Sequence, residues 1–371
     1  MNVERDGRLP PAAGRRPIAV IVSGFPRRSE TFALNELIAL EEAGKLLAIF
    51  ATKPGDRTPP HRDVARLANR VVMLPPGCPN EQADYVTSYL RGTQVAGIHG
   101  YFAHTPADVA ARAAAQLGVP YGFSAHARDA RKVHGADLER RGRGAALVVA
   151  CNADAAATLT LRGMQPVLIP HGVDTGRFAP IQAICQRGPI RLLAVGRLVP
   201  KKGFGVLLSA LANLDVPFTL RIIGDGPEGV PLQTAIDECS LGDRVKLCGG
   251  RTHDDLAREY AAADVVIVPS VEDRTGDRDG LPNVVLEAMA CGRPVLATRM
   301  GAIASAVEHR RTGWLVPAGD PPALAHAIRV LQGSVELRER LGREARRRVE
   351  RDFALRTCTE RLRNVLEAAY A

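Results

Sequence analysis

The amino-acid sequence predicts an α/β protein made of two doubly wound domains, each built on a parallel β-sheet. Short β-branched runs alternate with helical stretches, which is typical of parallel strands joined by crossover helices. This alternation stops at a stretch containing Pro, Gly and Gln, residues 178–189, and then starts again. The length of 371 residues exceeds one ordinary domain and suits two.

Strands in the first half are predicted from six short apolar runs. They are residues 18–23, 71–74, 95–99, 121–125, 146–151 and 166–170. Helices are predicted between them over residues 31–43, 105–117 and 153–162. We expect residues 1–177 to form the first domain, with residues 1–16 as a polar, disordered tail.

The second half repeats the pattern with six further runs. The predicted strands are residues 190–196, 218–224, 244–250, 263–270, 293–298 and 313–317. We expect residues 178–354 to form the second domain. Ligands of doubly wound sheets bind beyond the carboxyl ends of the strands, so the loops that follow the strands should carry function.

The composition indicates a globular protein, with 46% hydrophobic residues and no apolar run of the ~20 residues that a membrane helix needs. The first residues, MNVERDGRLPPAAGRRP, lack the apolar core of a signal peptide. Seven cysteines occur without a CxxC pair, which favours reduced packing residues. We therefore expect a cytoplasmic protein.

The net charge of +9 is unevenly distributed. Residues 1–188 contain 23 basic and 16 acidic side chains, whereas residues 189–371 contain 26 and 24. A basic first half favours a phosphate-bearing ligand or peripheral association with the inner face of an anionic membrane. No nucleic acid is expected as a partner, because no recognition helix, zinc spacing or aromatic RNA-binding motif accompanies the charge.

The loop GRLVPKKG, residues 196–203, is a candidate diphosphate site. Arg197 and Lys202 bracket it, and a helix is predicted to start near Phe204. Cations beside a helix N-terminus suit a diphosphate, because backbone amides and the helix dipole add to the side-chain charge.

The loop GDGPEG, residues 224–229, matches the GxGxxG pattern of dinucleotide-binding proteins and raises the alternative of an oxidoreductase. That fingerprint requires an acidic residue about 20 positions further on, where this sequence has KLCGG. Pro227 also removes an amide from the loop. We therefore interpret Gly224 and Gly226 as part of a tight turn beside a nucleotide.

The stretch VEDRTGDRDGLPNVVLEAMACGRPV, residues 271–295, gathers acidic side chains before an apolar helix. Three interpretations compete: a metal clamp on Asp277 and Asp279, the paired acids of a hydrolase, or acceptors for sugar hydroxyls. Pro282 can occupy the first turn of the helix, so the amides of Gly280, Leu281 and Asn283 should gather at its N-terminus. Carboxylates at this position can accept sugar or ribose hydroxyls.

The loop GFPRRSETF, residues 24–32, follows the first predicted strand. Gly24 allows close approach of a ligand to the backbone and is a candidate donor-binding residue. Arg27 and Arg28 provide positive charge, and with Glu30 they are candidate acceptor-binding residues.

Taken in order, GRLVPKKG, IIGDGPE, DGLPNVVLEAMACGRPV and TGWLVPAGD resemble the retaining nucleotide-sugar glycosyltransferases of family 4, and GFPRRSETF and FSAHARD resemble the exopolysaccharide-type members. The resemblance implies the GT-B fold, two Rossmann-like domains facing across a cleft, with a last helix at 355–371 crossing back to the first domain. It also implies catalytic roles. Arg197 and Lys202 hold the donor diphosphate, Glu287 the ribose and Asp279 the donor sugar, while His126 lies at the reacting face.

Two departures from the family pattern bear on specificity. The first acid of the family's E-x7-E motif is Asp279 here, one methylene shorter than Glu. The usual GG-I-P-E loop reads GAIAS at residues 301–305, with Ala302 and Ser305 in place of Gly and Glu.

The expected activity is transfer of a sugar from a nucleoside diphosphate donor to a glycan, a lipid-linked acceptor or a small-molecule hydroxyl. No cofactor and no metal are expected, because Arg197, Lys202 and a helix end already provide for the diphosphate. The alternatives are a paired-carboxylate glycosidase and a non-catalytic sugar-nucleotide-binding protein. The glycosidase would leave the GRLVPKKG loop without a purpose.

Overall fold

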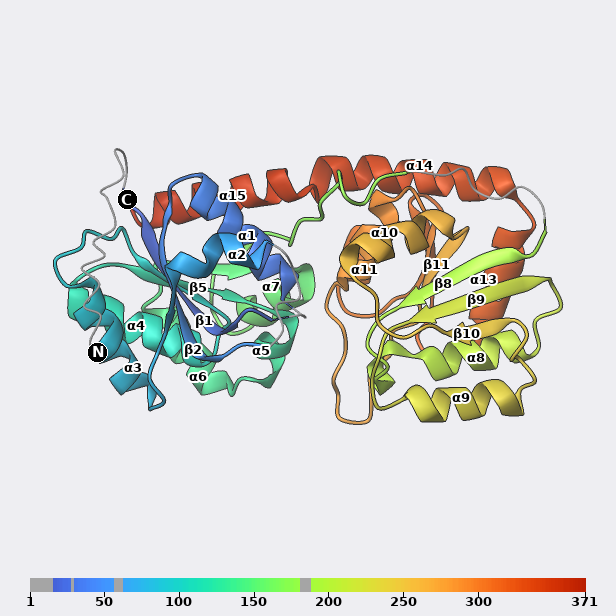
Figure 1. Ribbon diagram of the computed structural model, residues 1–371, viewed down its shortest axis with the longest axis horizontal. Coiled ribbons are helices and arrows are strands. Elements are labelled where there is room, and N and C mark those ends of the chain that lie inside the picture. Colours follow the sequence, from blue (N-terminus) through green and yellow to red (C-terminus); the bar gives the residue numbers. More distant parts are fainter. Residues whose placement is uncertain (1–15, 28–29, 57–62, 181–187) are drawn as a thin grey trace. The chain divides into compact units, whose positions relative to one another are not determined.

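The computed structural model describes residues 16–27, 30–56, 63–180 and 188–371 (Figure 1). The chain forms two compact units. The first unit contains the described residues up to Cys151 together with Ala155–Ile169 and Thr359–Ala371. The second unit contains Asn152–Asp154 and the described residues of Pro170–Cys358. The predicted tail therefore lies almost entirely outside the described residues.

The first unit contains a seven-stranded parallel sheet in the order β3-β2-β1-β4-β5-β6-β7. Its strands are β1 (Ile18–Phe25), β2 (Leu46–Pro54), β3 (Val71–Met73), β4 (Ile98–Tyr101), β5 (Tyr121–Ala125), β6 (Leu147–Ala150) and β7 (Val167–Leu168). The second unit contains a six-stranded parallel sheet in the order β10-β9-β8-β11-β12-β13. Its strands are β8 (Ile190–Val195), β9 (Phe218–Ile223), β10 (Val245–Leu247), β11 (Val265–Val268), β12 (Val295–Thr298) and β13 (Gly313–Val316).

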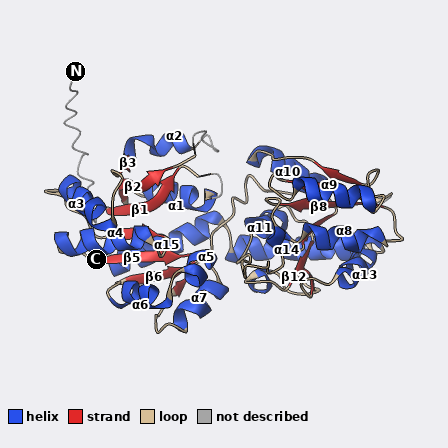
Figure 2. Ribbon diagram, turned by 90° about the horizontal axis from the view of Figure 1, so that it is seen from below, coloured by secondary structure: helices blue, strands red, loops and turns tan. Residues whose placement is uncertain are grey.

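In each unit the strands lie between helices on both faces (Figure 2). The helices that precede β8 are α1 (Thr31–Glu42), α2 (Val64–Leu67), the 3-10 helix η1 (Ala68–Arg70), α3 (Pro79–Leu90), α4 (Thr105–Leu117), α5 (Ala127–Lys132), α6 (Gly135–Arg143) and α7 (Ala153–Thr160). Those that follow it are the 3-10 helix η2 (Pro200–Lys202), α8 (Phe204–Ala212), α9 (Gly229–Glu238), α10 (His253–Ala262), α11 (Asn283–Ala290), α12 (Ile303–Ala306), α13 (Pro321–Gln332), α14 (Val335–Asp352) and α15 (Leu355–Ala369). The predicted doubly wound α/β class is confirmed in both units.

The continuous apolar runs of the strands are explained by burial on both faces of each sheet. In β1, Ile18, Val20 and Val22 belong to one hydrophobic cluster, whereas Ala19 and Ile21 belong to the cluster on the other face. Parallel strands covered by helices lack the apolar–polar alternation of half-exposed strands. The sequence pattern did not predict β2, because LLAIFA follows α1 after only three residues and its apolar run has no strand period.

The predicted strand at 95–99 begins later, at Ile98. Val95 precedes the strand but is buried in the same cluster as Ile98. In the sequence pattern its apolar side chain therefore resembles a strand residue.

The passage from the first unit to the second falls between Ile169 and Pro170, earlier than the boundary at 177/178 given by the sequence. Val173 forms a parallel bridge with Ala354, and Phe178 packs edge-on against Tyr260 in the core of the second unit. These long-range contacts attach the segment to the unit that follows it.

The end of the chain completes the core of the first unit. Leu362 and Leu366 of α15 and Tyr370, which follows it, are buried in the cluster that covers one face of the first sheet. The Tyr370 hydroxyl lies 2.8 Å from Nδ1 of His99, whose Nε2 lies 2.9 Å from the Ser124 hydroxyl. Burial lowers the pKa of His99 to about 3, so its imidazole is neutral at physiological pH. Among the described residues, no helix is both long enough and apolar enough to span a membrane.

Candidate active site

The loop of residues 196–203 follows β8, at the point where the strand order of the second sheet reverses between β8 and β11. Ligands of doubly wound sheets bind at such a reversal. Arg197 is exposed, and no polar contact of its side chain is found among the described residues. Lys202 is different, because its Nζ donates to Oδ2 of Asp279 at 2.8 Å. The loop therefore presents the Arg197 guanidinium to solvent and holds the Lys202 ammonium against a carboxylate.

The loop of residues 224–229 packs closely against the loop of residues 196–203. A side chain on Gly224 would place Cβ 1.8 Å from the carbonyl oxygen of Gly196, and one on Gly226 would place it 2.3 Å from that of Leu198. Leu198 also donates its amide to the carbonyl of Asp225 at 2.9 Å. Gly224 and Gly226 are thus required by backbone packing between two strand-end loops.

Asp279 connects the acidic loop to two neighbouring segments. Its side chain is buried, and Oδ2 accepts hydrogen bonds from Lys202 Nζ and from the Ser270 hydroxyl, each at 2.8 Å. Oδ1 lies 3.6 Å from Nζ of Lys201. Burial alone would raise the pKa of the Asp279 carboxyl, but Lys202, Ser270 and Lys201 together hold it below its usual value. The carboxylate is therefore ionised at neutral pH.

The two acids of the Asp277-Arg278-Asp279 sequence share one lysine. Nζ of Lys201 lies 3.1 Å from Oδ2 of Asp277 as well as 3.6 Å from Oδ1 of Asp279. Val271, which opens the acidic loop, donates its amide to the carbonyl of Lys201 at 2.9 Å. Side chain and backbone of Lys201 thus both connect the loop after β8 to the acidic loop.

The GAIAS loop contacts the acidic loop through its backbone. The amide of Ala302 donates to the carbonyl of Gly280 at 3.0 Å, and the Ser305 hydroxyl donates to the carbonyl of Ala302 at 2.7 Å. Ala302 and Ser305, which replace the usual Gly and Glu, are therefore compatible with a loop that supports Gly280.

Helix α11 begins at Asn283, one residue later than the sequence predicts. Pro282 has an extended ψ of 134° and is the N-cap, so the prediction that it occupies the first turn was wrong. Gly280 and Leu281 precede the helix, and of the three predicted amides only that of Asn283 belongs to its first turn. The helix ends as predicted, with Gly292 at φ +67° after the last turn.

Glu287 is buried inside α11 and is 6% exposed. Its Oε2 accepts a hydrogen bond from the Tyr260 hydroxyl of α10 at 2.7 Å. Burial raises the pKa of Glu287 to about 7, although the Tyr260 hydrogen bond works against this rise. Asp279 and Glu287 therefore occupy different electrostatic environments, one holding an ionised carboxylate and the other a carboxyl with a raised pKa.

In the first unit, the loop after β1 brings two of the predicted acceptor residues together. Arg27 Nη1 lies 3.7 Å from Oε1 of Glu30. Burial raises the pKa of Glu30, and Arg27 partly counteracts this. Gly24 lies at the end of β1, where it pairs with Lys53 of β2. Arg28 lies outside the described residues.

His126 follows β5 and is the N-cap of α5. Its ring packs against those of Phe32 and Phe102, with centroid distances of 4.8 and 4.6 Å. Asp129 accepts the backbone amide of His126 at 3.1 Å, and its Oδ2 is 3.9 Å from Nδ1 of the ring. Phe102 has a φ of +85°, which is unusual for a residue with a side chain. Aromatic contacts and the neighbouring Asp129 therefore hold the His126 ring in place.

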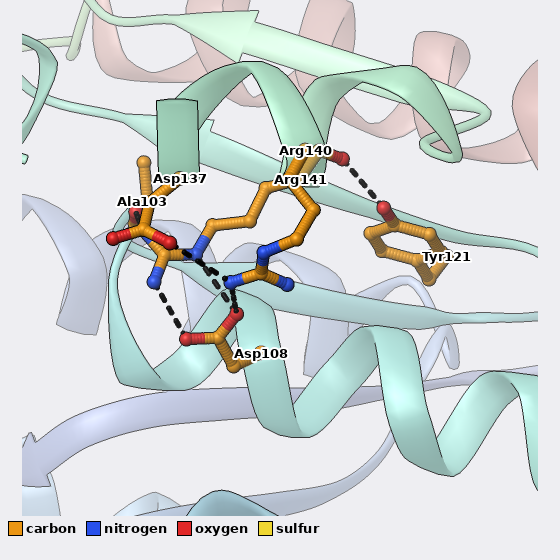
Figure 3. A network of polar contacts seen from close by, with 6 residues as sticks. All are labelled: Ala103, Asp108, Tyr121, Asp137, Arg140 and Arg141. Atoms are coloured by element: carbon orange, nitrogen blue, oxygen red, sulfur yellow. Dashed lines mark hydrogen bonds and ion pairs between the residues drawn. The ribbon is translucent and has the colours of Figure 1, made fainter. Parts of the chain in front are cut away.

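Ala103 is held from both sides beside this histidine. Its amide donates to Oδ2 of Asp129 at 2.7 Å, and its carbonyl accepts from Nη1 of Arg141 at 2.9 Å. Figure 3 shows that the Arg141 guanidinium also faces the carboxylate of Asp108, to which Nε donates at 2.9 Å. Buried ionic groups thus fix the strand-end loop that carries Phe102.

Four residues of these sites were not selected from the sequence: Asp129, Lys201, Tyr260 and Ser270. The spacing of Asp129 three residues after His126 is a capping-box signal that could have identified it. Lys201 adjoins Lys202 and could have been included with it. Tyr260 and Ser270 carry no local signal.

Comparison with known proteins agrees with this geometry. The profile described as "Glycosyltransferase Family 4" matches residues 29–177, and that described as "Glycosyl transferases group 1" matches residues 189–333. WcaL of Escherichia coli K12, assigned as a colanic acid biosynthesis glycosyltransferase, is 28% identical over 93% of this chain and 98% of its own length. AmsK of Erwinia amylovora, an amylovoran biosynthesis glycosyltransferase, is 37% identical over 48% of this chain and 45% of its own length.

A solved structure resembles the whole fold. Anabaena HepE, crystallised with UDP, has a TM-score of 0.80 at 18% identity and covers 95% of this chain and 100% of its own. The fold is therefore that of the GT-B glycosyltransferases. The chain belongs to glycosyltransferase family 4.

The raised pKa of Glu287 predicts a stability difference that depends on pH. In the unfolded chain this carboxyl ionises near 4.5, whereas in the folded chain it ionises near 7. Between these two pKa values the folded chain keeps a proton that the unfolded chain has released. The free energy of unfolding therefore decreases as the pH rises through this window. Between pH 5 and 8, the wild type should lose about 3 kcal/mol of unfolding free energy relative to Glu287→Gln.

Urea unfolding of both proteins at several pH values measures this difference. The matched control is Glu238→Gln, which removes an exposed carboxylate from the same unit. Parallel pH curves for wild type and Glu287→Gln would contradict a buried, protonated Glu287.

Proposed function

We propose that the protein is a retaining glycosyltransferase that moves a hexosyl group from a nucleoside diphosphate sugar to a hydroxyl of a glycan, a glycolipid or a small molecule. The observation that carries the proposal is the cluster of Lys202 and Asp279 beside exposed Arg197, at the strand reversal of the second sheet. This cluster combines cations for a diphosphate with a carboxylate for sugar hydroxyls.

A nucleotide-sugar donor is supported by the relatives and by the charges. HepE, which shares the fold, has been crystallised with UDP-glucose. In this chain Arg197 is accessible for a diphosphate oxygen, and Lys202 lies at the start of α8, where the amides of the first turn favour an anion. Glu287 is proposed to accept ribose hydroxyls, which requires it to exchange or share its contact with Tyr260.

The proposed chemistry needs no side-chain nucleophile. As the bond between the anomeric carbon and the diphosphate oxygen breaks, negative charge grows on the departing diphosphate, and Arg197 and Lys202 stabilise that charge. The acceptor oxygen forms a bond to the anomeric carbon on the face that the diphosphate leaves, and the leaving phosphate accepts the proton of that hydroxyl, so the configuration is retained. Asp279 is proposed to orient the sugar through its hydroxyls.

An exopolysaccharide or lipid-linked acceptor is the class that the relatives favour, because WcaL and AmsK are named for the biosynthesis of polysaccharides. Arg27 and Glu30 in the loop after β1 are the proposed acceptor contacts. The excess of basic residues in the first half suits an anionic acceptor or carrier.

The Lys202 ammonium is predicted to act mainly in the transition state, where charge on the diphosphate is greatest. Lys202→Ala should therefore lower kcat by roughly a hundred- to a thousand-fold, corresponding to about 3–4 kcal/mol. Lys202→Arg should recover part of the loss, limited by the geometry of guanidinium. The measurement is release of nucleoside diphosphate with the best donor from a panel of UDP-, GDP- and ADP-sugars.

The control for this experiment is Lys246→Ala, which removes an exposed lysine of β10 in the same unit. A thermal melt establishes that each variant is folded. Unchanged kcat in folded Lys202→Ala would remove the leaving-group role from this loop, and absence of turnover in the wild type with every donor would favour a non-catalytic binding protein.

Transfer is also predicted to proceed without a divalent metal. Asp277 and Asp279, the acids available for a metal clamp, are paired with the ammonium groups of Lys201 and Lys202. The wild-type rate in excess EDTA should stay within about twofold of that with Mg²⁺, since the diphosphate is neutralised by side chains. Abolition by EDTA and recovery with Mg²⁺ or Mn²⁺ would instead support the metal clamp.

The basic first half predicts peripheral binding to anionic membranes. Sedimentation with phosphatidylglycerol vesicles should remove the protein from solution at low salt, with less binding at high salt because ions screen surface charge. Neutral phosphatidylcholine vesicles are the control. Equal, negligible sedimentation with both lipids would exclude membrane association of this kind.

A further inference from the structure

Lys201 occupies a position that the proposed function does not yet explain. Its side chain is 16% exposed, and Nζ lies between two carboxylates, 3.1 Å from Asp277 and 3.6 Å from Asp279. Its backbone is fixed independently, because its carbonyl accepts the amide of Val271. Lys201 can therefore keep its place when the neighbouring Lys202 side chain moves.

The charges around Asp279 are balanced only while both lysines are present. Lys201 and Lys202 approach it from η2, Ser270 from the end of β11, and Asp277 and Arg278 belong to its own loop. The GAIAS loop that packs on this backbone follows Arg299, which is exposed, and the nearest acid of α11, Glu287, faces Tyr260. Arg278 pairs with Asp154 at 2.9 Å and Glu272 at 3.2 Å, so the local set around Asp279 is two carboxylates and two ammonium groups.

Binding of a diphosphate would disturb this balance. If Lys202 turns toward the leaving group, Asp279 loses its shortest ionic contact, the one at 2.8 Å. A buried carboxylate that loses its partner is strongly destabilised, and it responds by taking up a proton. A protonated Asp279 would accept hydroxyl hydrogen bonds less strongly, so a second cation is needed in the reacting complex.

On these grounds we propose that Lys201 is a positioning residue that maintains Asp279 as a carboxylate when Lys202 engages the donor diphosphate. This proposal rests on the proposed function. It adds that Asp277 competes with Asp279 for Lys201. Oδ1 of Asp277 is buried and has no hydrogen-bond partner among the described residues, so Lys201 is the cation that stabilises this acid as well.

The test is the pH profile of kcat at saturating donor, measured from pH 5 to 9 by release of nucleoside diphosphate, because kcat reports ionisations in the donor-bound complex. Lys201→Met removes the charge while keeping most of the side-chain volume. It should move the acid limb upward by about one pH unit, a rate loss of roughly tenfold at the low end. Lys201→Arg should restore the wild-type limb. Asp277→Asn should move the limb downward, because Lys201 is then free to pair with Asp279 alone.

The opposite shifts of the two variants separate positioning from general damage. Loss of fold or of local packing lowers the rate at every pH, and Lys246→Met serves as the control for removal of a lysine. An unshifted acid limb in folded Lys201→Met overturns the proposal, as does an upward shift in Asp277→Asn. If Lys201→Met does not fold, Asp277→Asn decides alone: a downward shift supports the proposal, and no shift overturns it.

This outcome is distinguishable from failure of the proposed function. If the wild type turns over a donor and Lys202→Ala is impaired, the transferase assignment stands whatever Lys201 does. If the wild type turns over no donor sugar, the proposed function itself is rejected.

Discussion

The Asp279 carboxylate must stay ionised although it is buried, and the ligand-facing edge of the second sheet is organised around this constraint. Its contacts with Lys202 and Ser270 connect the loop after β8 to the end of β11, across 77 residues in the first case. Loss of either neighbour would leave the buried Asp279 charge without full compensation. The resulting loss of stability is larger than the stability that a surface ion pair contributes. One acid thus fixes the geometry of loops that come from separate parts of the chain.

The first unit uses a related arrangement around its histidine. Asp129 accepts the amides of His126 and Ala103, so one buried carboxylate joins the ends of β4 and β5. Burial would raise the pKa of Asp129, but the His126 and Ala103 contacts hold it lowered. In both units an acid buried at the carboxyl ends of the strands is satisfied by hydrogen bonds, and it orients a residue that we place in the transfer reaction.

The surroundings of Glu287 add a contact that its motif does not indicate. Its place in the family motif implies a ribose contact, and the structure adds that its carboxylate accepts a hydrogen bond from Tyr260 and has a pKa raised to about 7. The helix that carries it begins one residue later than Pro282 suggested. The helical period of the sequence predicts which residues share a face of α11. It does not predict whether that face contacts solvent or another helix, because α10 lies outside the motif.

The sequence by itself determined the doubly wound class, twelve of the strands in outline, and the loops that carry Arg197, Lys202 and Asp279. These follow from local period, strand-end position and residue chemistry, which are readable over a few residues. Tertiary structure alone decided that β2 is a strand, that the segment from Pro170 belongs to the second unit, and that Lys201 lies between Asp277 and Asp279. Each of these depends on contacts between residues distant in sequence, and no local pattern specifies which buried partner a side chain will meet.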